Sequence, residues 1–171
     1  MSYSLEFYFK DSTPTDTLKY VVSQCNKVLL KDFGQYHLLK QDNPPELIAT
    51  ATNKLGVVVG LLTLHYIEAA SAWELGTMSA LEKSTHNNIF MLIMVHVPDV
   101  LMKTINDPGK PTWIVKRVKQ DNRHHIKVLK QVGFEEPEHF LVGVLSNEGY
   151  IPFDPFDEVL MKRRLCPVAV V

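Results

Sequence analysis

One stretch constrains the fold of this chain more than any other: a strand, a polar loop and a long apolar helix follow one another directly. The strand is expected over Ala72–Ala80, the loop over Leu81–Asn88 and the helix over Ile89–Thr104. A helix that starts after such a loop presents free backbone N–H groups, and the positive end of its dipole adds to them. Such helix starts commonly bind phosphate groups. The sequence therefore predicts an anion-binding loop at its centre.

Length, charge and cysteine content bound the class of protein. The 171 residues predict one domain, over 1–165, followed by an apolar tail, 166–171. A net charge of -1 argues against general attraction to nucleic acid or to an anionic membrane. The longest apolar run, 89–95, is too short to cross a bilayer. Cys25 and Cys166 lie far apart without metal-ligand spacing, so we expect a soluble cytoplasmic protein without a metal site.

Hydrophobic periodicity and turn residues predict further elements on both sides of the central stretch. In chain order they are a strand over Leu5–Phe9, a helix from Thr15 or Asp16 to about Phe33, strands over Glu46–Thr52 and Leu55–Ile67, a strand over Thr112–Val118, a helix from Asp121 or Asn122 to Val132, and strands over Phe140–Leu145 and Phe156–Met161. The predicted fold class is α/β (α+β), with a mixed, mostly antiparallel central sheet and helices on both faces. Parallel neighbours should meet across the central helix.

Three places among these elements carry more detailed predictions. One face of the first helix should be buried, and it consists of Leu18, Val21, Val22, Cys25, Val28 and Leu29. A hairpin turn is expected at Asn53-Lys54 between the second and third strands. Gly60, inside the third strand, indicates a bulge or a close backbone approach.

The order of elements, together with three local patterns, resembles the GNAT superfamily of N-acetyltransferases. Trp73–Met78 (WELGTM) is similar to the fourth strand of that family. Asn122–Phe134 (NRHHIKVLKQVGF) is similar to its Asn, amphipathic helix and terminal Gly-Phe, and Asp157–Leu165 (DEVLMKRRL) is similar to its closing strand. The likeness covers nearly the whole chain.

The resemblance implies acetyl-CoA as co-substrate. By position, the backbone of Met78 and Ala80 would contact the pantetheine arm, and Asn122 would approach the cofactor further along the chain. The pyrophosphate loop would consist of Thr85, His86, Asn87 and Asn88. The implied activity is transfer of an acetyl group to an amine.

The chain departs from the family pattern at four positions. The family's loop has a basic or amide residue and two small residues where this chain has Thr85, Asn88 and Phe90, and no glycine lies between Gly76 and Gly109. Glycine matters there because the backbone must approach the pyrophosphate without an intervening Cβ. The Tyr that protonates the leaving thiolate in the family aligns with Leu129.

Candidate proton-transfer residues each have a structural alternative. Glu74 is the candidate base, or else a surface carboxylate at a strand edge. His139 and Tyr150 are candidates for proton transfer, although an ordinary structural role is the simpler reading of each. A local basic stretch fits a solvated helix face that could meet the 3′-phosphate of CoA; its members are Lys116, Arg117, Lys119, Arg123, Lys127 and Lys130.

Two functional hypotheses follow. In the first, the chain is an N-acetyltransferase that acts on an amine of unknown identity. In the second, it is a catalytically inactive GNAT-fold protein that serves as a binding or structural module. No nucleic-acid or membrane partner is expected, and the oligomeric state is left open, a homodimer included.

Overall fold

The computed structural model describes residues 2–68, 71–104, 113–136 and 157–165. Their helices and strands are β1 (Ser4–Phe9), α1 (Thr15–Phe33), β2 (Leu47–Thr52), β3 (Val58–Ile67), β4 (Ala72–Ala80), α2 (His86–Met102), β5 (Trp113–Lys119), α3 (Arg123–Gln131) and β6 (Glu158–Arg164), with the short 3₁₀ helices η1 (Gln35–His37) and η3 (Lys83–Thr85). The predicted strands at 140–145 and tail at 166–171 lie outside these residues.

The described strands form one hydrogen-bonded sheet in the order β1-β2-β3-β4-β5-β6. The pairs β1–β2, β2–β3 and β5–β6 are antiparallel. β4 and β5, which flank α2 in the sequence, pair in parallel over Ala72–Glu74 and Trp113–Val115. The predicted fold class, a mixed and mostly antiparallel sheet with helices, is confirmed.

The chain divides into two compact units, and each is described by itself. Unit 1 comprises residues 1–65 and 76–97, and unit 2 comprises residues 66–75 and 98–171. The expectation of a single domain over 1–165 stays a prediction.

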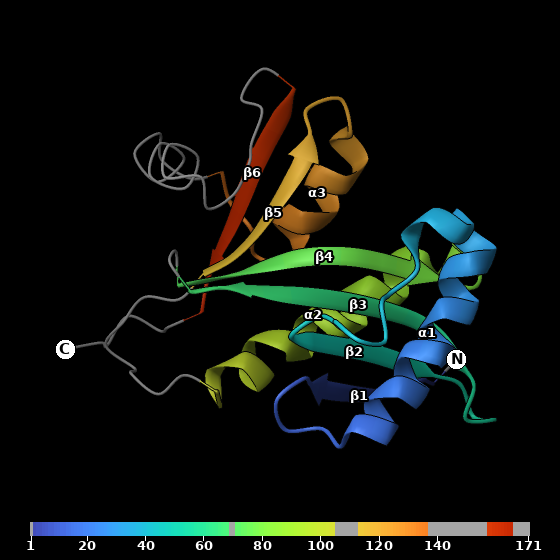
Figure 1. The fold of residues 1–171 in the computed structure, drawn as a ribbon. Helices are drawn as coiled ribbons and strands as arrows, with labels where there is room; N and C mark the ends of the chain where they lie inside the picture. The colour runs from blue at the N-terminus through green and yellow to red at the C-terminus, as the bar shows by residue number, and fades with distance from the viewer. Residues whose placement is uncertain (1, 69–70, 105–112, 137–156, 166–171) are drawn as a thin grey trace. The chain divides into compact units, whose positions relative to one another are not determined.

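The core of unit 1 forms where α1 packs on the strands (Figure 1). The six apolar residues predicted for the inner face of α1 are all buried, and they cluster with Ile48 of β2 and Leu61 of β3. Burial raises the pKa of the Cys25 thiol to about 12. Cys25 therefore remains protonated at neutral pH and fills space in the core as a small apolar group.

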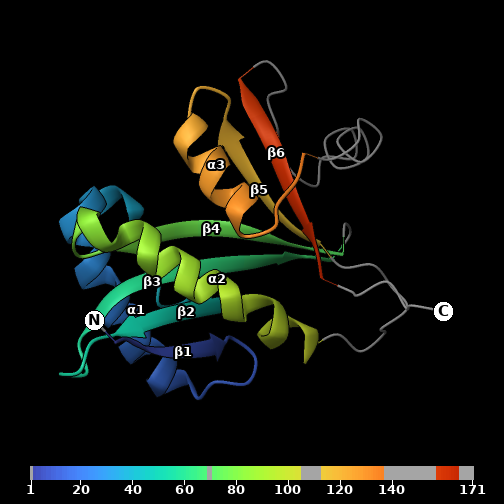
Figure 2. The same cartoon turned by 180° about the vertical axis from the view of Figure 1, so that it is seen from behind.

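The helix α2 covers the opposite face of the unit 1 strands, as the reverse view shows (Figure 2). Its residues Ile89, Ile93 and Met94 are fully buried. A Cβ added at Gly60 of β3 would lie 2.6 Å from Cγ2 of Ile89, which is closer than real Cβ contacts allow. The ladder between β2 and β3 also shifts register at this point, between Ala51 and Thr52. Both roles predicted for Gly60, a close approach and an irregular ladder, are confirmed.

The turn between β2 and β3 differs from the predicted two-residue hairpin at Asn53-Lys54. The side-chain oxygen of Asn53 accepts hydrogen bonds from the amides of Leu55 and Val57, at 3.0 and 3.1 Å. Gly56 supplies the positive φ of +75° that the turn needs. The turn therefore extends to Val57, and Leu55, expected to begin the strand, is 86% exposed.

Other boundaries shift for local reasons. Thr15 is the first residue of α1 rather than its cap; Pro14 precedes it, and no side chain caps the helix. The expected end near Phe33 is confirmed, because the amide of Gly34 bonds to the carbonyl of Leu30. In unit 2, β6 begins at Glu158 rather than at Phe156.

Unit 2 is organised by the antiparallel pair β5–β6, with α3 on one face (Figure 2). Val128 and Leu129 of α3 are buried. Gly133, with φ of +90°, ends the helix as predicted. The guanidinium of Arg163 on β6 then donates to the carbonyl of Val132 at 2.6 Å and fastens the helix end to the strand.

Substitution of Gly60 by Ala should destabilise the protein by about 1–3 kcal/mol, the usual cost of overpacking a filled core. The reason is the contact of the new Cβ with Ile89. Urea unfolding of the wild type, Gly60→Ala, Ile89→Ala and the double variant would measure it. The loss caused by Gly60→Ala should shrink when Ile89 is already Ala; an equal loss in both backgrounds would contradict the packing argument.

Candidate functional site

The polar loop after β4 is shorter than the sequence predicts. The helix α2 begins at His86, three residues before the expected Ile89, and the 3₁₀ turn η3 precedes it directly. Within this turn the amide of Thr85 donates to the carbonyl of Glu82 at 3.0 Å, and the amide of His86 donates to the carbonyl of Lys83. These two amides therefore already have partners, and any anion would have to be held mainly by other groups of the first helical turn.

The first turn of α2 still has features that suit a phosphate. Asn87 and Asn88 are exposed, and Lys83 supplies an exposed cation just before them. The helix has 17 residues, so its dipole places partial positive charge at this end. Phe90, which replaces a small residue of the family loop, is only 2% exposed. Its ring belongs to the core and does not cover the loop.

The strand β4 is held to β3 by a side chain at the point where it leads toward this loop. The Thr63 hydroxyl accepts a hydrogen bond from the amide of Thr77 at 2.8 Å and donates to the carbonyl of the same residue at 3.4 Å. A Cβ added at Gly76 would lie 2.5 Å from this hydroxyl oxygen. Gly76 must therefore be glycine, because Thr63 occupies the space of a side chain.

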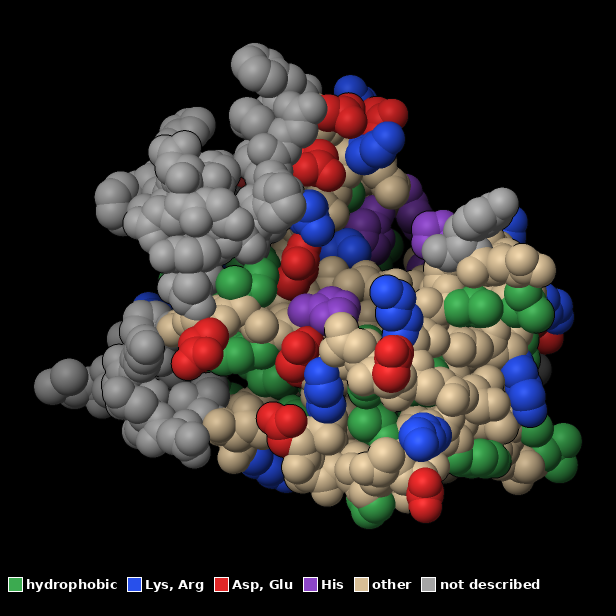
Figure 3. All heavy atoms as spheres, in the orientation of Figure 1, with side chains coloured by type: hydrophobic (Ala, Val, Ile, Leu, Met, Phe, Trp, Pro, Cys, Tyr) green, Lys and Arg blue, Asp and Glu red, His purple; other side chains and the backbone are tan. Residues whose placement is uncertain are grey.

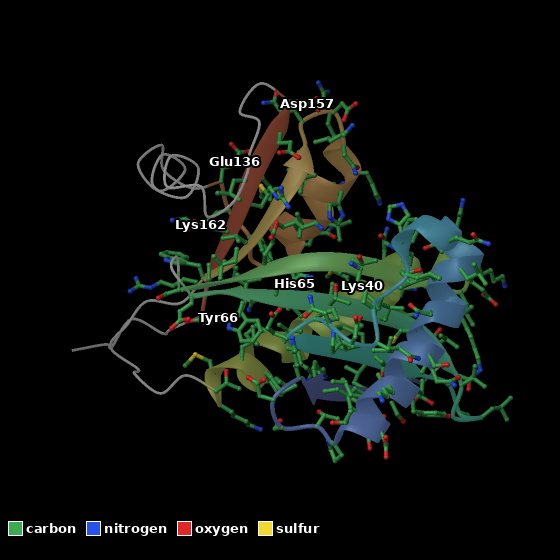
Figure 4. The ribbon with its side chains drawn as sticks, viewed as in Figure 1. Lys40, His65, Tyr66, Glu136, Asp157 and Lys162 are labelled. Atoms are coloured by element: carbon green, nitrogen blue, oxygen red, sulfur yellow. The ribbon has the colours of Figure 1, made fainter. Side chains whose placement is uncertain are left out.

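A histidine–carboxylate pair stands beside Gly76, and sequence reasoning missed it. Nδ1 of His65, on β3, lies 3.1 Å from Oε2 of Glu46, just before β2. The other edge of the ring faces β4, since a Cβ added at Gly76 would lie 3.3 Å from Nε2. His65 and Lys40 are labelled on the face of the strands in view (Figure 4), where Figure 3 shows histidine beside acidic and basic side chains.

The register of the hairpin explains why the pair was missed. The predicted two-residue turn at Asn53-Lys54 would place Glu46 opposite Leu61. The observed register pairs Leu47 with Leu64, so Glu46 lies next to His65 instead. The only signal in the sequence was a histidine near the end of an otherwise apolar strand.

Met78 and Ala80, the predicted pantetheine contacts, lie in β4 between Gly76 and the loop. Between them, the buried Ser79 hydroxyl donates to Oδ2 of Asp32 at 2.6 Å. This bond fastens the last turns of α1 to the end of β4. The predicted contacts Met78, Ala80, Thr85, His86, Asn87 and Asn88 thus all belong to unit 1 and follow one another along a single strand, turn and helix start.

Glu74, the predicted base, belongs to unit 2 and is ion-paired. Its Oε1 accepts a hydrogen bond from Nε of Arg117 on β5 at 2.8 Å, and its side chain is 18% exposed. One carboxylate oxygen is therefore committed to a charged partner. The role of Glu74 as base stays a prediction.

Lys116 does not lie on the solvated helix face to which its basic stretch was assigned. It belongs to β5, and its ammonium donates to the carbonyl of Leu75 at 3.1 Å. Burial lowers the pKa of Lys116, the charge of Arg117 lowers it further, and the carboxylate of Glu74 opposes both. A carbonyl bond and a nearby carboxylate thus stabilise a cation in a largely buried place.

Asn122 and Leu129 occupy structural positions in α3. The side-chain oxygen of Asn122 accepts from the amide of His125 at 3.2 Å, so Asn122 is the N-cap that the sequence predicts. Its contact with a cofactor stays a prediction. Leu129, at the family's Tyr position, is 0% exposed and belongs to the core.

His139 and Tyr150 lie outside the described residues. Among the residues that the structure describes, no group of three or more His, Cys, Asp or Glu is placed to hold a metal ion. No described helix has the length and apolar character needed to cross a membrane.

Solved structures share this arrangement over nearly the whole chain. The aminoglycoside 6′-N-acetyltransferase from Enterococcus faecium has a TM-score of 0.61 and 11% identity, with 96% of this chain and 98% of that chain covered. The chain has the GNAT fold. The catalytic domain of Tetrahymena GCN5 histone acetyltransferase, solved in complex with coenzyme A, gives 0.59 and 11%, with 99% and 97% covered.

A third GNAT enzyme, the ribosomal-protein-S18-alanine N-acetyltransferase from Escherichia coli, gives a TM-score of 0.59 and 12% identity, with 98% and 97% covered. No family model matches the chain, and no curated protein sequence matches it. The named acceptors of these GNAT neighbours differ, being an aminoglycoside, a histone and a ribosomal protein. At such identity the likeness shows the fold.

The lowered pKa of Lys116 predicts a pH dependence of stability. Between that pKa and the ordinary lysine value of about 10.4, the unfolded chain binds more protons than the folded one. The free energy of unfolding contributed by Lys116 therefore rises with pH through this window. Urea unfolding at several alkaline pH values should show the free energy of unfolding of the wild type rising relative to that of Lys116→Met. Lys119 is an exposed lysine of the same strand, so Lys119→Met is the control and should follow the wild type. Parallel pH curves for Lys116→Met and the wild type would refute the assignment.

Proposed function

We propose that this protein transfers an acetyl group from acetyl-CoA to an amine acceptor. The observation that carries the proposal is the succession of β4, η3 and α2 within a GNAT fold, which offers a strand edge and a helix start in line. A GNAT neighbour with this fold holds coenzyme A.

In this proposal acetyl-CoA lies along unit 1, from the start of α2 to β4. The pyrophosphate meets the first turn of α2, where Asn87 and Asn88 are exposed and Lys83 adds positive charge. The pantetheine arm follows the backbone of Ala80 and Met78. A contact of Asn122 with the cofactor stays a prediction of the sequence. The engaged amides of Thr85 and His86 leave the side chains to hold much of the pyrophosphate.

The proposed reaction needs a base but no bound metal. The ammonium of the acceptor loses a proton to the base, and the amine nitrogen attacks the thioester carbonyl carbon. A C–N bond forms, the C–S bond breaks, and the second proton of the nitrogen goes to the leaving thiolate. The products are an N-acetylated amine and CoA. Glu74, through its second carboxylate oxygen, is the base that the sequence suggests.

A second function, an inactive GNAT-fold binding module, is favoured by Leu129. This buried leucine stands where the family places the thiolate-protonating Tyr, so that acid is missing. A protein with this function would bind a partner without releasing CoA. The experiments that separate these two functions also address the acceptor and the oligomeric state.

Isothermal titration with acetyl-CoA, combined with an assay for free CoA, tests the two functions against each other. Saturable binding together with CoA release on addition of an amine supports the transferase. No heat at about 1 mM acetyl-CoA, a concentration corresponding to roughly 4 kcal/mol of binding, would refute it. Binding without release would favour the inactive module, and light scattering of the eluted protein would then show whether it pairs with itself.

Substitution of Asn88 by Trp should weaken acetyl-CoA binding about tenfold or more, since a bulky ring at the helix start blocks approach of the pyrophosphate. Asn88 is exposed, so the fold should tolerate the change. Val95→Trp, at a 64% exposed position of the same helix, is the matched control and should bind as the wild type does. Equal dissociation constants for the two variants in titration calorimetry would place the pyrophosphate elsewhere.

A further inference from the structure

We propose that His65 and Glu46 form the catalytic base of the acetyl transfer, with His65 as the group that takes the proton from the acceptor amine. This inference rests on the proposed function and deepens it. It is carried by the juxtaposition of an oriented imidazole with the one position of β4 that has no room for a side chain.

The contact with Glu46 determines which nitrogen of His65 is free. An ionised carboxylate only accepts hydrogen bonds, so Nδ1 carries the proton and donates it to Oε2 of Glu46 across 3.1 Å. In the neutral ring Nε2 then has its lone pair available. When Nε2 takes a proton, the carboxylate stabilises the resulting imidazolium. In such pairs the acid residue orients the histidine and stabilises its charged form, and the histidine takes the proton.

Nε2 faces β4 at Gly76. A Cβ there would stand 3.3 Å from Nε2 and 3.2 Å from Cδ2 of His65. Because Thr63 already requires glycine at this position, no side chain separates the ring from the strand. The His65 side chain is 50% exposed, so solvent reaches it.

The direction of the bound substrate brings the thioester to the same place. The proposed contacts run from the start of α2 to Ala80 and then back along β4 to Met78. Strand residues rise about 3.3 Å each, so Gly76 lies roughly 7 Å beyond Met78 along this line. The thioester follows the pantetheine arm, and it therefore reaches the part of β4 beside His65. All the groups in this argument belong to unit 1.

Glu74 is the less suitable base. Its Oε1 is held by Arg117 at 2.8 Å, and its side chain is 18% exposed against 50% for His65. A carboxylate fixed in an ion pair stabilises two strands, whereas an imidazole with one free nitrogen can exchange protons with solvent after each cycle. Glu74 therefore stabilises the β4–β5 pair through its ion pair with Arg117.

The proton balance involves no further reactant. His65 Nε2 removes one proton from the acceptor ammonium, and the amine attacks the carbonyl carbon of the thioester. The C–S bond breaks, and the second nitrogen proton passes to the thiolate of CoA. The imidazolium then returns its proton to water.

A modification experiment tests the placement without needing the acceptor. Diethyl pyrocarbonate acylates free imidazole nitrogens, and mass spectrometry of peptides locates the product. Saturating acetyl-CoA, verified by titration of the same sample, should protect His65 at least about tenfold, while exposed His96 of α2 should react equally with and without it. Full binding with His65 unprotected would overturn the inference. Absence of binding would instead refute the proposed function, so the two failures are distinguishable.

A kinetic experiment tests the role. Amines that follow the acceptors named for the GNAT neighbours serve as probes: an aminoglycoside, a histone and an alanine peptide from a ribosomal protein. With any accepted amine, His65→Ala should lower kcat about 100-fold or more with the dissociation constant of acetyl-CoA unchanged, and added imidazole should restore part of the rate. Glu46→Gln should lower kcat less, and His96→Gln should not change it. If Glu74→Gln abolishes turnover while His65→Ala retains it, the base is Glu74 and the inference is wrong.

Discussion

The double hydrogen bond between the Thr63 hydroxyl and the backbone of Thr77 is the constraint on which the rest of the candidate site depends. Thr63 is 1% exposed, so its hydroxyl has no access to water and must bond within the protein. It does so by accepting from the amide and donating to the carbonyl of Thr77. The hydroxyl then fills the space beside β4 and requires a glycine at position 76. Without a side chain there, the ring of His65 lies directly against the strand.

The start of α2, which the sequence predicts as a phosphate-binding loop, has a local structure of its own. The 3₁₀ turn η3 uses the amides of Thr85 and His86 for its own hydrogen bonds. Asn87 and Asn88 follow in the first turn of the helix and are exposed. The burial of Phe90 in the core removes the steric objection that its size raised in the sequence. This loop therefore has the same place in the fold as a glycine-rich loop. It differs from one in the polar groups that it presents.

Much of the fold was predictable because it follows from local periodicity. The six buried residues of α1 were identified from their spacing, and Gly34 and Gly133 were identified as helix ends. Predictions failed where a side chain rearranges the backbone. The oxygen of Asn53 accepts two amides and lengthens a turn expected to have two residues. At Glu82–His86 a 3₁₀ turn stands where a loop was expected, and the helix starts earlier in the chain. The loop sequence carries no distinct signal for this turn.

The candidate site likewise has a part that local sequence predicts and a part that it does not. The succession of strand, turn and helix that carries Met78 to Asn88 could be predicted from the sequence because these elements are contiguous in the chain, while the contact of these residues with a cofactor stays a prediction. Asn122 was predicted as a helix cap from its residue type just before an amphipathic helix, which is also a local signal. Three features could not be predicted from the sequence. They are the pairing of His65 with Glu46, the insertion of Thr63 beside Gly76 and the burial of Lys116. Each depends on the register between strands, and register is settled by the length of a turn and by the packing of both faces of the sheet, which no local pattern encodes.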